Sequence, residues 1–110
     1  MGYVFRYFYG LCMAVGFAMA AAHAAPAPQR VDLPPLPSGV VLHAHWLPAE
    51  GAERRPAVLA LHGCGGLYAK GGGLAERYRE TAERLHAAGY AVLMPDSFGS
   101  RGLRDICQTR

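Results

Sequence analysis

The chain contains 110 residues, carries a formal net charge of +3, and has 17% charged residues. A chain of this composition is not expected to be disordered. The charge is also too small to indicate a nucleic-acid partner, and no other macromolecular partner follows from it.

The first 24 residues predict a secretory signal peptide. Arg6 precedes an apolar run without charge from Tyr7 to Ala22, and Ala22-His23-Ala24 offers the small residues that a signal peptidase accepts. The alternatives are an uncleaved anchor helix and a merely hydrophobic N-terminus, but the run is short for a bilayer and rich in alanine and glycine. We therefore expect a secreted or periplasmic protein in an oxidising compartment, free of the membrane after cleavage.

Residues 25–38 are dense in proline, and we expect them to form an extended lead-in with one edge strand at Arg30–Leu33. A regular pattern begins at Gly39. The folded domain is therefore predicted to span residues 39–110.

A strand near the edge of a sheet is predicted next, because Leu42, Ala44 and Trp46 alternate with His43 and His45. Two histidines at this spacing can bind a metal ion. No third ligand lies close in the sequence, so we expect both histidines to face solvent and predict no metal site.

Two further strands are predicted to be covered on both faces, as in the interior of a parallel sheet. Ala57–Leu61 is an unbroken apolar run that ends at His62, and Tyr90–Met94 repeats this pattern before Pro95. The interior position of both strands follows from the lack of polar alternation.

The segment between these strands predicts an amphipathic helix that Gly89 terminates. Glu80 and Arg84 are placed to pair across one helical turn. A strand, a helix and a second strand make a β–α–β unit with a right-handed crossover, so the predicted fold class is α/β. The apolar face of the helix consists of Leu74, Tyr78, Ala82, Leu85 and Ala88.

The glycine-rich loop HGCGGLYAKGGG follows the first covered strand, at the strand end where open α/β sheets bind ligands. A phosphate loop does not fit, because Lys70 precedes its glycines and no Ser or Thr follows. A dinucleotide loop does not fit either, because Tyr68 stands where the third glycine belongs. The His-Gly start instead suits an oxyanion hole, in which a backbone N–H approaches a reacting carbonyl. A strand-to-helix turn without a ligand is the alternative.

From Gly39 to Arg110 the chain resembles the N-terminal part of the dienelactone hydrolase family, within the α/β-hydrolase superfamily. The resemblance rests on HGCGGLY, on RYRETAERLHAAGY in the helix, on VLMPDSFGSRG and on a final IC. It implies the first portion of an α/β-hydrolase sheet, namely edge strands followed by the β–α–β unit. It also implies hydrolysis of a small-molecule ester or lactone by a Cys or Ser nucleophile with Asp and His, without a cofactor.

The resemblance assigns roles to Cys64, Gly65 and Arg101. The backbone N–H of Cys64, with Gly65 second, corresponds to the oxyanion donor. Arg101 lies near a substrate-binding arginine of the family, offset by one residue. His62 opens the motif and is not expected to be the catalytic base, which comes last in the chain order of this fold. Asp96 is expected to cap or turn the loop that follows the second covered strand.

No nucleophile elbow, Gly-x-Ser-x-Gly or Gly-x-Cys-x-Gly, occurs in the sequence. The nucleophile, acid and base would then all follow Arg110, so we expect a fragment that is inactive alone. A non-catalytic exported module that binds a small ligand or a partner is the alternative. The substrate and the oligomeric state do not follow from the sequence.

Cys64 and Cys107 lie on loops predicted to leave the same end of neighbouring strands. We expect a disulfide between them, which would stabilise the fold by about 4 kcal/mol in the chain-entropy model. The alternatives are a reactive Cys64 and two free buried thiols.

Overall fold

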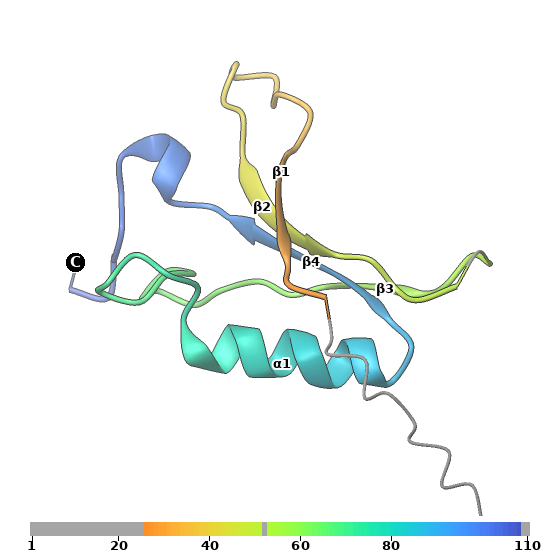
Figure 1. The fold of residues 1–110 in the computed structure, drawn as a ribbon. Coiled ribbons are helices and arrows are strands. Elements are labelled where there is room, and N and C mark those ends of the chain that lie inside the picture. Colours follow the sequence, from red (N-terminus) through yellow and green to blue (C-terminus); the bar gives the residue numbers. More distant parts are fainter. Residues whose placement is uncertain (1–25, 52, 109–110) are drawn as a thin grey trace, which may run out of the picture.

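The computed structural model describes residues 26–51 and 53–108, so the predicted signal peptide, residues 1–24, lies outside the described residues. The described residues form a small α/β fold of a four-stranded sheet and one α-helix (Figure 1). In chain order its elements are β1 (Gln29–Asp32), β2 (His43–Leu47), β3 (Ala57–Leu59), α1 (Glu76–Ala87), β4 (Ala91–Asp96) and the 3-10 helix η1 (Gly99–Arg101).

The strand order in the sheet is β1-β2-β4-β3. β2 pairs antiparallel with β1 and with β4, so that His45 lies opposite Arg30 on one side and Met94 on the other. β3 pairs parallel with β4, with Val58 opposite Val92. The predicted β–α–β arrangement is therefore confirmed as β3–α1–β4, and the predicted edge strand is β1.

The hydrophobic core lies between the sheet and α1, where Leu47, Leu67, Ala82, Val92 and Met94 are buried. These side chains come from β2, the glycine-rich loop, α1 and β4, so the core fixes the loop against the helix and the sheet. The partly buried residues packed against it are Ala60, Tyr68, Leu74, Tyr78 and Leu85.

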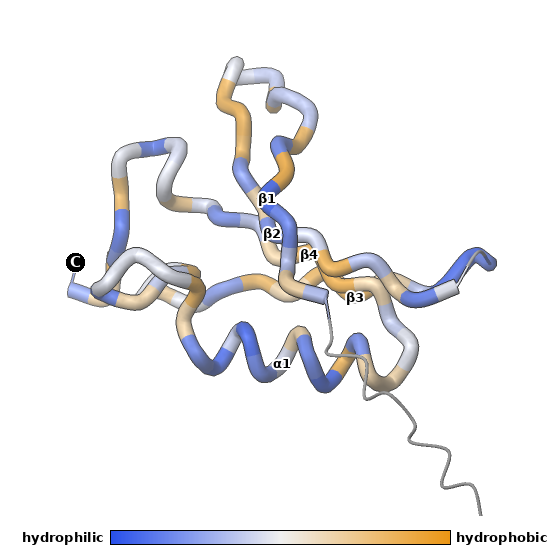
Figure 2. Tube along the Cα trace, in the orientation of Figure 1, coloured by the Kyte–Doolittle hydropathy of each residue, from blue (hydrophilic) through white to orange (hydrophobic). Residues whose placement is uncertain are grey.

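α1 confirms the predicted helix, with one correction to its buried face. Ala88 is exposed, whereas His86 is buried with 7% of its surface accessible. Gly89 adopts a left-handed φ of +90°, which a glycine accommodates without strain, and it ends the helix as predicted. Glu80 and Arg84 approach to 3.8 Å. Figure 2 shows α1 as mostly hydrophilic, as expected for a helix with one face in water.

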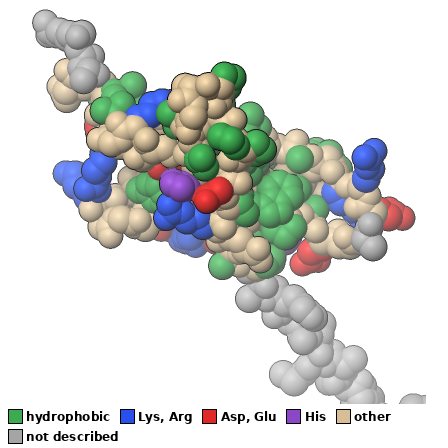
Figure 3. Space-filling model, turned by 90° about the horizontal axis from the view of Figure 1, so that it is seen from above, with side chains coloured by type: hydrophobic (Ala, Val, Ile, Leu, Met, Phe, Trp, Pro, Cys, Tyr) green, Lys and Arg blue, Asp and Glu red, His purple; other side chains and the backbone are tan. Residues whose placement is uncertain are grey.

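β3 differs from its prediction as an interior strand. It has three residues and lies at the edge of the sheet, and Leu59 and Leu61 are 59% and 67% exposed. The reason is that, within the described residues, no strand pairs with its outer side and α1 covers one face of the sheet only. Hydrophobic side chains gather on the face seen from above, away from α1 (Figure 3).

None of the described helices is both long and apolar enough to span a membrane.

Candidate functional site

The chain makes a tight turn directly after β3, at Gly63–Gly66. The N–H of Gly66 donates to the carbonyl of Gly63 at 3.0 Å, which leaves Cys64 and Gly65 as the two central residues. Within the described part of the chain, no hydrogen bond is found from the N–H of Cys64 or of Gly65. Both predicted oxyanion donors are therefore free to bind a ligand.

The two glycines of this turn are required for different reasons. Gly66 has a φ of +77°, and a methyl group there would lie 2.4 Å from the carbonyl oxygen of Arg104. The fold itself therefore needs glycine at this position. A methyl group on Gly65 would make only ordinary contacts, 3.7 Å from Nη2 of Arg77 and 4.0 Å from Sγ of Cys107. The packing of the fold therefore does not require glycine at position 65. Close approach of a ligand to the amide of Gly65 would require it.

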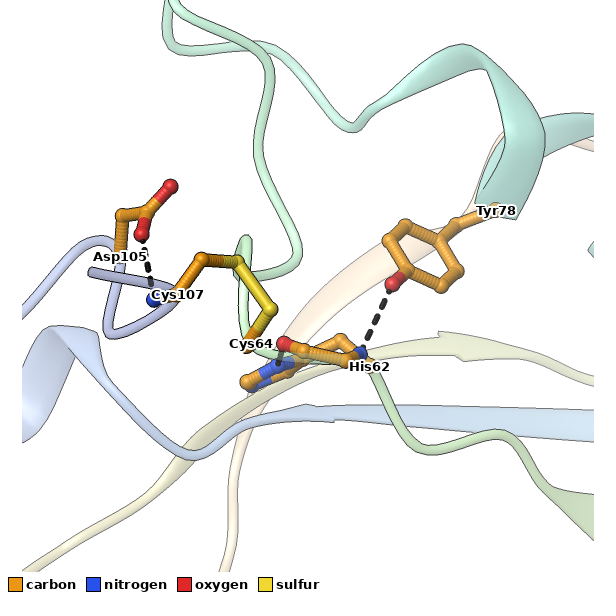
Figure 4. The surroundings of a disulfide bond; sticks show 6 residues. His62, Cys64, Tyr78, Asp105 and Cys107 are labelled. Atoms are coloured by element: carbon orange, nitrogen blue, oxygen red, sulfur yellow. Dashed lines mark hydrogen bonds between the residues drawn. A yellow bond between two sulfur atoms is a disulfide. The ribbon is translucent and has the colours of Figure 1, made fainter. Parts of the chain in front are cut away.

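Two side chains brace the start of the turn. The N–H of Gly63 donates to the hydroxyl of Tyr78 at 3.0 Å, from the first turns of α1 (Figure 4). His62 donates from Nδ1 to the carbonyl of Gly63 at 2.9 Å and accepts the N–H of Ser97 on Nε2 at 3.0 Å. With Nε2 acting as an acceptor, His62 is the neutral Nδ1–H tautomer. It therefore ties the loop after β3 to the loop after β4.

Cys64 and Cys107 form the predicted disulfide, with their Cα atoms 4.9 Å apart (Figure 4). The N–H of Ile106 donates to the carbonyl of Cys64 at 2.9 Å, and the carboxylate of Asp105 accepts the N–H of Cys107 at 2.7 Å. The C-terminal segment is thus fixed along the turn. Because its sulfur is bonded, Cys64 has no free thiol that could act as a nucleophile.

Asp96 caps the loop after β4, as predicted. Its carboxylate is nearly inaccessible and accepts the N–H groups of Phe98 and Gly99 at 3.0 and 3.1 Å. A methyl group on Gly99 would lie 2.3 Å from this carboxylate, so Gly99 is needed for the cap.

Arg101 ends η1, is exposed, and donates to the carbonyl of Ser97.

A pocket of about 800 Å³ opens at the same edge of the sheet, between the start of β2, the glycine-rich loop and the C-terminal segment. Neither Cys64 nor Gly65 lines it, nor does Arg101. The pocket is lined by Arg30, His43, His45, Leu67, Tyr68, Lys70, Gly71, Gly72, Asp96, Phe98, Gly99, Leu103 and Arg104.

The two histidines of β2 line this pocket and are half-buried, so the prediction that both face solvent holds only in part. His43 donates from Nδ1 to the carboxylate of Asp32 at 2.6 Å, and His45 shares a hydrogen bond of 3.1 Å with the hydroxyl of Tyr68. Tyr68 contacts the ring of His45, which the alternating pattern of the strand could not indicate.

Burial and nearby charges shift two pKa values in the pocket. Burial, followed by the positive charge of Arg30, lowers the pKa of His45 below 6.5, against a smaller opposing effect of Asp96. Burial, followed by the charge of Asp96, raises the pKa of Tyr68, with Arg30 opposing. Both side chains are therefore neutral at pH 7.

Among residues 26–51 and 53–108, no group of three or more His, Cys, Asp or Glu side chains could hold a metal ion. The partners of His43 and His45 are instead Asp32 and Tyr68.

Sequence reasoning missed Tyr78 as a support of the turn and missed the basic residues of the pocket. Tyr78 had been placed on the apolar face of α1, and a tyrosine near the start of a helix that follows a glycine loop is the signal that could have identified it. Arg30, Lys70 and Arg104 are far apart in the sequence, and no local pattern links them.

Comparison of the chain with protein-family models, with curated proteins and with solved structures finds no match.

Proposed function

We propose that residues 39–110 form the N-terminal portion of an exported ester or lactone hydrolase of the dienelactone hydrolase type. In this proposal the backbone N–H groups of Cys64 and Gly65 contribute to the oxyanion hole. The observation that carries the proposal is that neither amide donates a hydrogen bond to any of the described residues, in the turn that follows β3.

The chemistry follows from the position of these donors. Attack on an ester carbonyl places a negative charge on its oxygen, and fixed N–H groups stabilise that charge without reorganising. His62 and Tyr78 bond to the backbone of Gly63 and so hold the turn in one conformation. The guanidinium of Arg77, which lies over the ring of Tyr78 at 4.8 Å and beside Gly65, adds positive charge near the same amides.

The nucleophile, acid and base of such an enzyme are not supplied by this sequence, since it contains no nucleophile elbow. We therefore assign to the described residues a contribution to the oxyanion hole and no step of proton transfer. Arg101 remains a candidate for substrate binding, although its guanidinium already donates to the carbonyl of Ser97.

A non-catalytic exported module is the second candidate function. The observation that favours it is the large pocket beside the turn, which needs no nucleophile to bind a ligand. The disulfide supports export in both candidates, because such bonds persist in oxidising compartments.

The coding sequence beyond Arg110 tests the proposal. The hydrolase requires Gly-x-Ser-x-Gly or Gly-x-Cys-x-Gly in the following codons, then Asp and then His. We expect ester hydrolysis by the longer product and none above background by the 110-residue chain. A stop codon directly after Arg110, together with a stable and soluble chain, would instead support the module.

A further inference from the structure

We propose that the pocket lined by Arg30, Lys70 and Arg104 binds a small organic molecule that carries two or more negative charges. This inference goes beyond the proposed hydrolase function and does not depend on it, because the pocket does not include Cys64 or Gly65.

Three cationic side chains line the pocket from three separate parts of the chain. Arg30 comes from β1, Lys70 from the glycine-rich loop, and Arg104 from the segment after η1. Within the described residues, none of the three forms an ion pair with a carboxylate. Arg104 makes one long hydrogen bond, of 3.4 Å, to the carbonyl of Lys70. The folded chain therefore collects three positive charges around one pocket, and no carboxylate of the described residues pairs directly with them.

One carboxylate, that of Asp96, lines the pocket together with the three cationic side chains. Asp96 is 5% exposed, and its carboxylate accepts the N–H groups of Phe98 and Gly99. Asp32 accepts a hydrogen bond from His43. Because three cationic side chains outnumber the carboxylate of Asp96, the lining carries a net positive charge, which favours an anion over a neutral or cationic ligand.

The rest of the lining suits an organic molecule rather than a bare ion. Phe98 and Leu103 provide apolar surface, while His45 and Tyr68 are neutral and bonded to one another. A volume of about 800 Å³ lies in the range of small-molecule sites. The guanidinium groups can each bind a carboxylate or a phosphate with two parallel hydrogen bonds, so three cations match a ligand with at least two charges.

Isothermal titration calorimetry on the full chain, with its disulfide formed and at low ionic strength, tests the proposal. The probes are citrate for a polycarboxylate and glycerol 3-phosphate for a phosphate ester, with propionate as the singly charged control. We expect saturable binding of at least one of the first two probes, and which one binds identifies the source of the charge. Propionate should bind at least about tenfold more weakly. Absence of saturable binding of both polyanions, or equal binding of propionate, would overturn the proposal.

Variants then place the ligand in this pocket. Arg30→Gln and Lys70→Met each remove one charge at an exposed side chain, so the fold should be retained, and each should weaken binding by about five- to tenfold. Arg54→Gln is the matched control, because Arg54 is exposed and does not line the pocket. If Arg54→Gln weakened binding as much as the other two, the effect would be one of net charge and the assigned site would be wrong.

Discussion

The adjacent glycines Gly65 and Gly66 show how the same residue type serves two purposes. Gly66 is fixed by its left-handed φ and by the approach of the carbonyl of Arg104. Gly65 has neither constraint, and its N–H makes no hydrogen bond within the described residues. Substitution of Gly66 therefore tests the stability of the fold, and a change at Gly65 tests the access of a ligand to its amide.

Gly66→Ala should lower the free energy of unfolding by about 2–4 kcal/mol, because it combines a strained backbone with a contact of 2.4 Å to backbone. Chemical denaturation of the oxidised chain measures this loss. Gly73→Ala is the control: a methyl group there has nothing within 4 Å, so stability should change by less than about 0.5 kcal/mol. Equal stability of the two variants would contradict the close approach of Arg104.

His45 should titrate below its usual pKa of 6.5, because burial and Arg30 disfavour the imidazolium. As pH falls through 6.5, the unfolded chain takes up a proton that the folded chain excludes, so this group makes stability fall with pH from 6.5 down to the folded pKa. NMR titration of the imidazole gives the midpoint. Arg30→Gln should move it upward, and a midpoint that stayed in place would exclude the effect of Arg30.

At the scale of elements, the regular patterns were sufficient for most of the fold. Period-3.6 spacing located α1, and unbroken apolar runs located β3 and β4, because burial requires these patterns wherever the element packs. The proline-rich lead-in still yielded β1, within one residue at each end.

The sequence-based predictions of burial were wrong where burial depends on which segments lie next to a strand in the fold. The apolar run at β3 indicated an interior strand, yet Leu59 and Leu61 are exposed because the described sheet has no strand beyond it. The same limit applies to the candidate site. The motif at Cys64 and Gly65 is local and was readable, whereas the pocket joins residues 30, 70 and 104, which only the fold brings together.

His86 is a buried histidine in α1, and its Nδ1 has no hydrogen-bond partner among the described residues. Its Nε2 lies 3.6 Å from Glu50, whose side chain is largely exposed and loses little if the imidazole is removed. His86→Leu should therefore not destabilise the chain, and should add up to about 1 kcal/mol to the free energy of unfolding.

Urea denaturation of His86→Leu, with Ala87→Leu as an exposed control on the same helix, measures the change. A loss above about 2 kcal/mol for His86→Leu alone would show that the imidazole makes a stabilising contact that this account omits.

At the scale of the whole molecule, the disulfide joins the turn after β3 to the C-terminal segment, 43 residues away. In Figure 1 the segment that follows η1 runs to the side of the glycine-rich loop. This link holds together the turn with the free amides and the wall of the pocket that carries Arg104.

The double variant Cys64→Ser and Cys107→Ser should lower the free energy of unfolding by about 4 kcal/mol, because the unfolded chain regains the entropy of a loop of this length. Both cysteines are exposed, so the serine hydroxyls face water and add no buried polar group. Denaturation with and without a reductant measures the effect: the parent chain should respond to the reductant and the double variant should not. Two titratable thiols in the non-reduced parent chain would contradict the bond.

The central claim is that the N–H groups of Cys64 and Gly65 both contribute to an oxyanion hole, and replacing the N–H of Gly65 by an ester oxygen tests it most directly. Peptide ligation at Cys64 can introduce the change into the product that continues past Arg110, with the same replacement at Gly73 as control. We predict that kcat for ester hydrolysis falls about 10²–10³-fold at Gly65 and is unchanged at Gly73. An unchanged kcat at Gly65, in a protein that hydrolyses esters, would contradict the assignment.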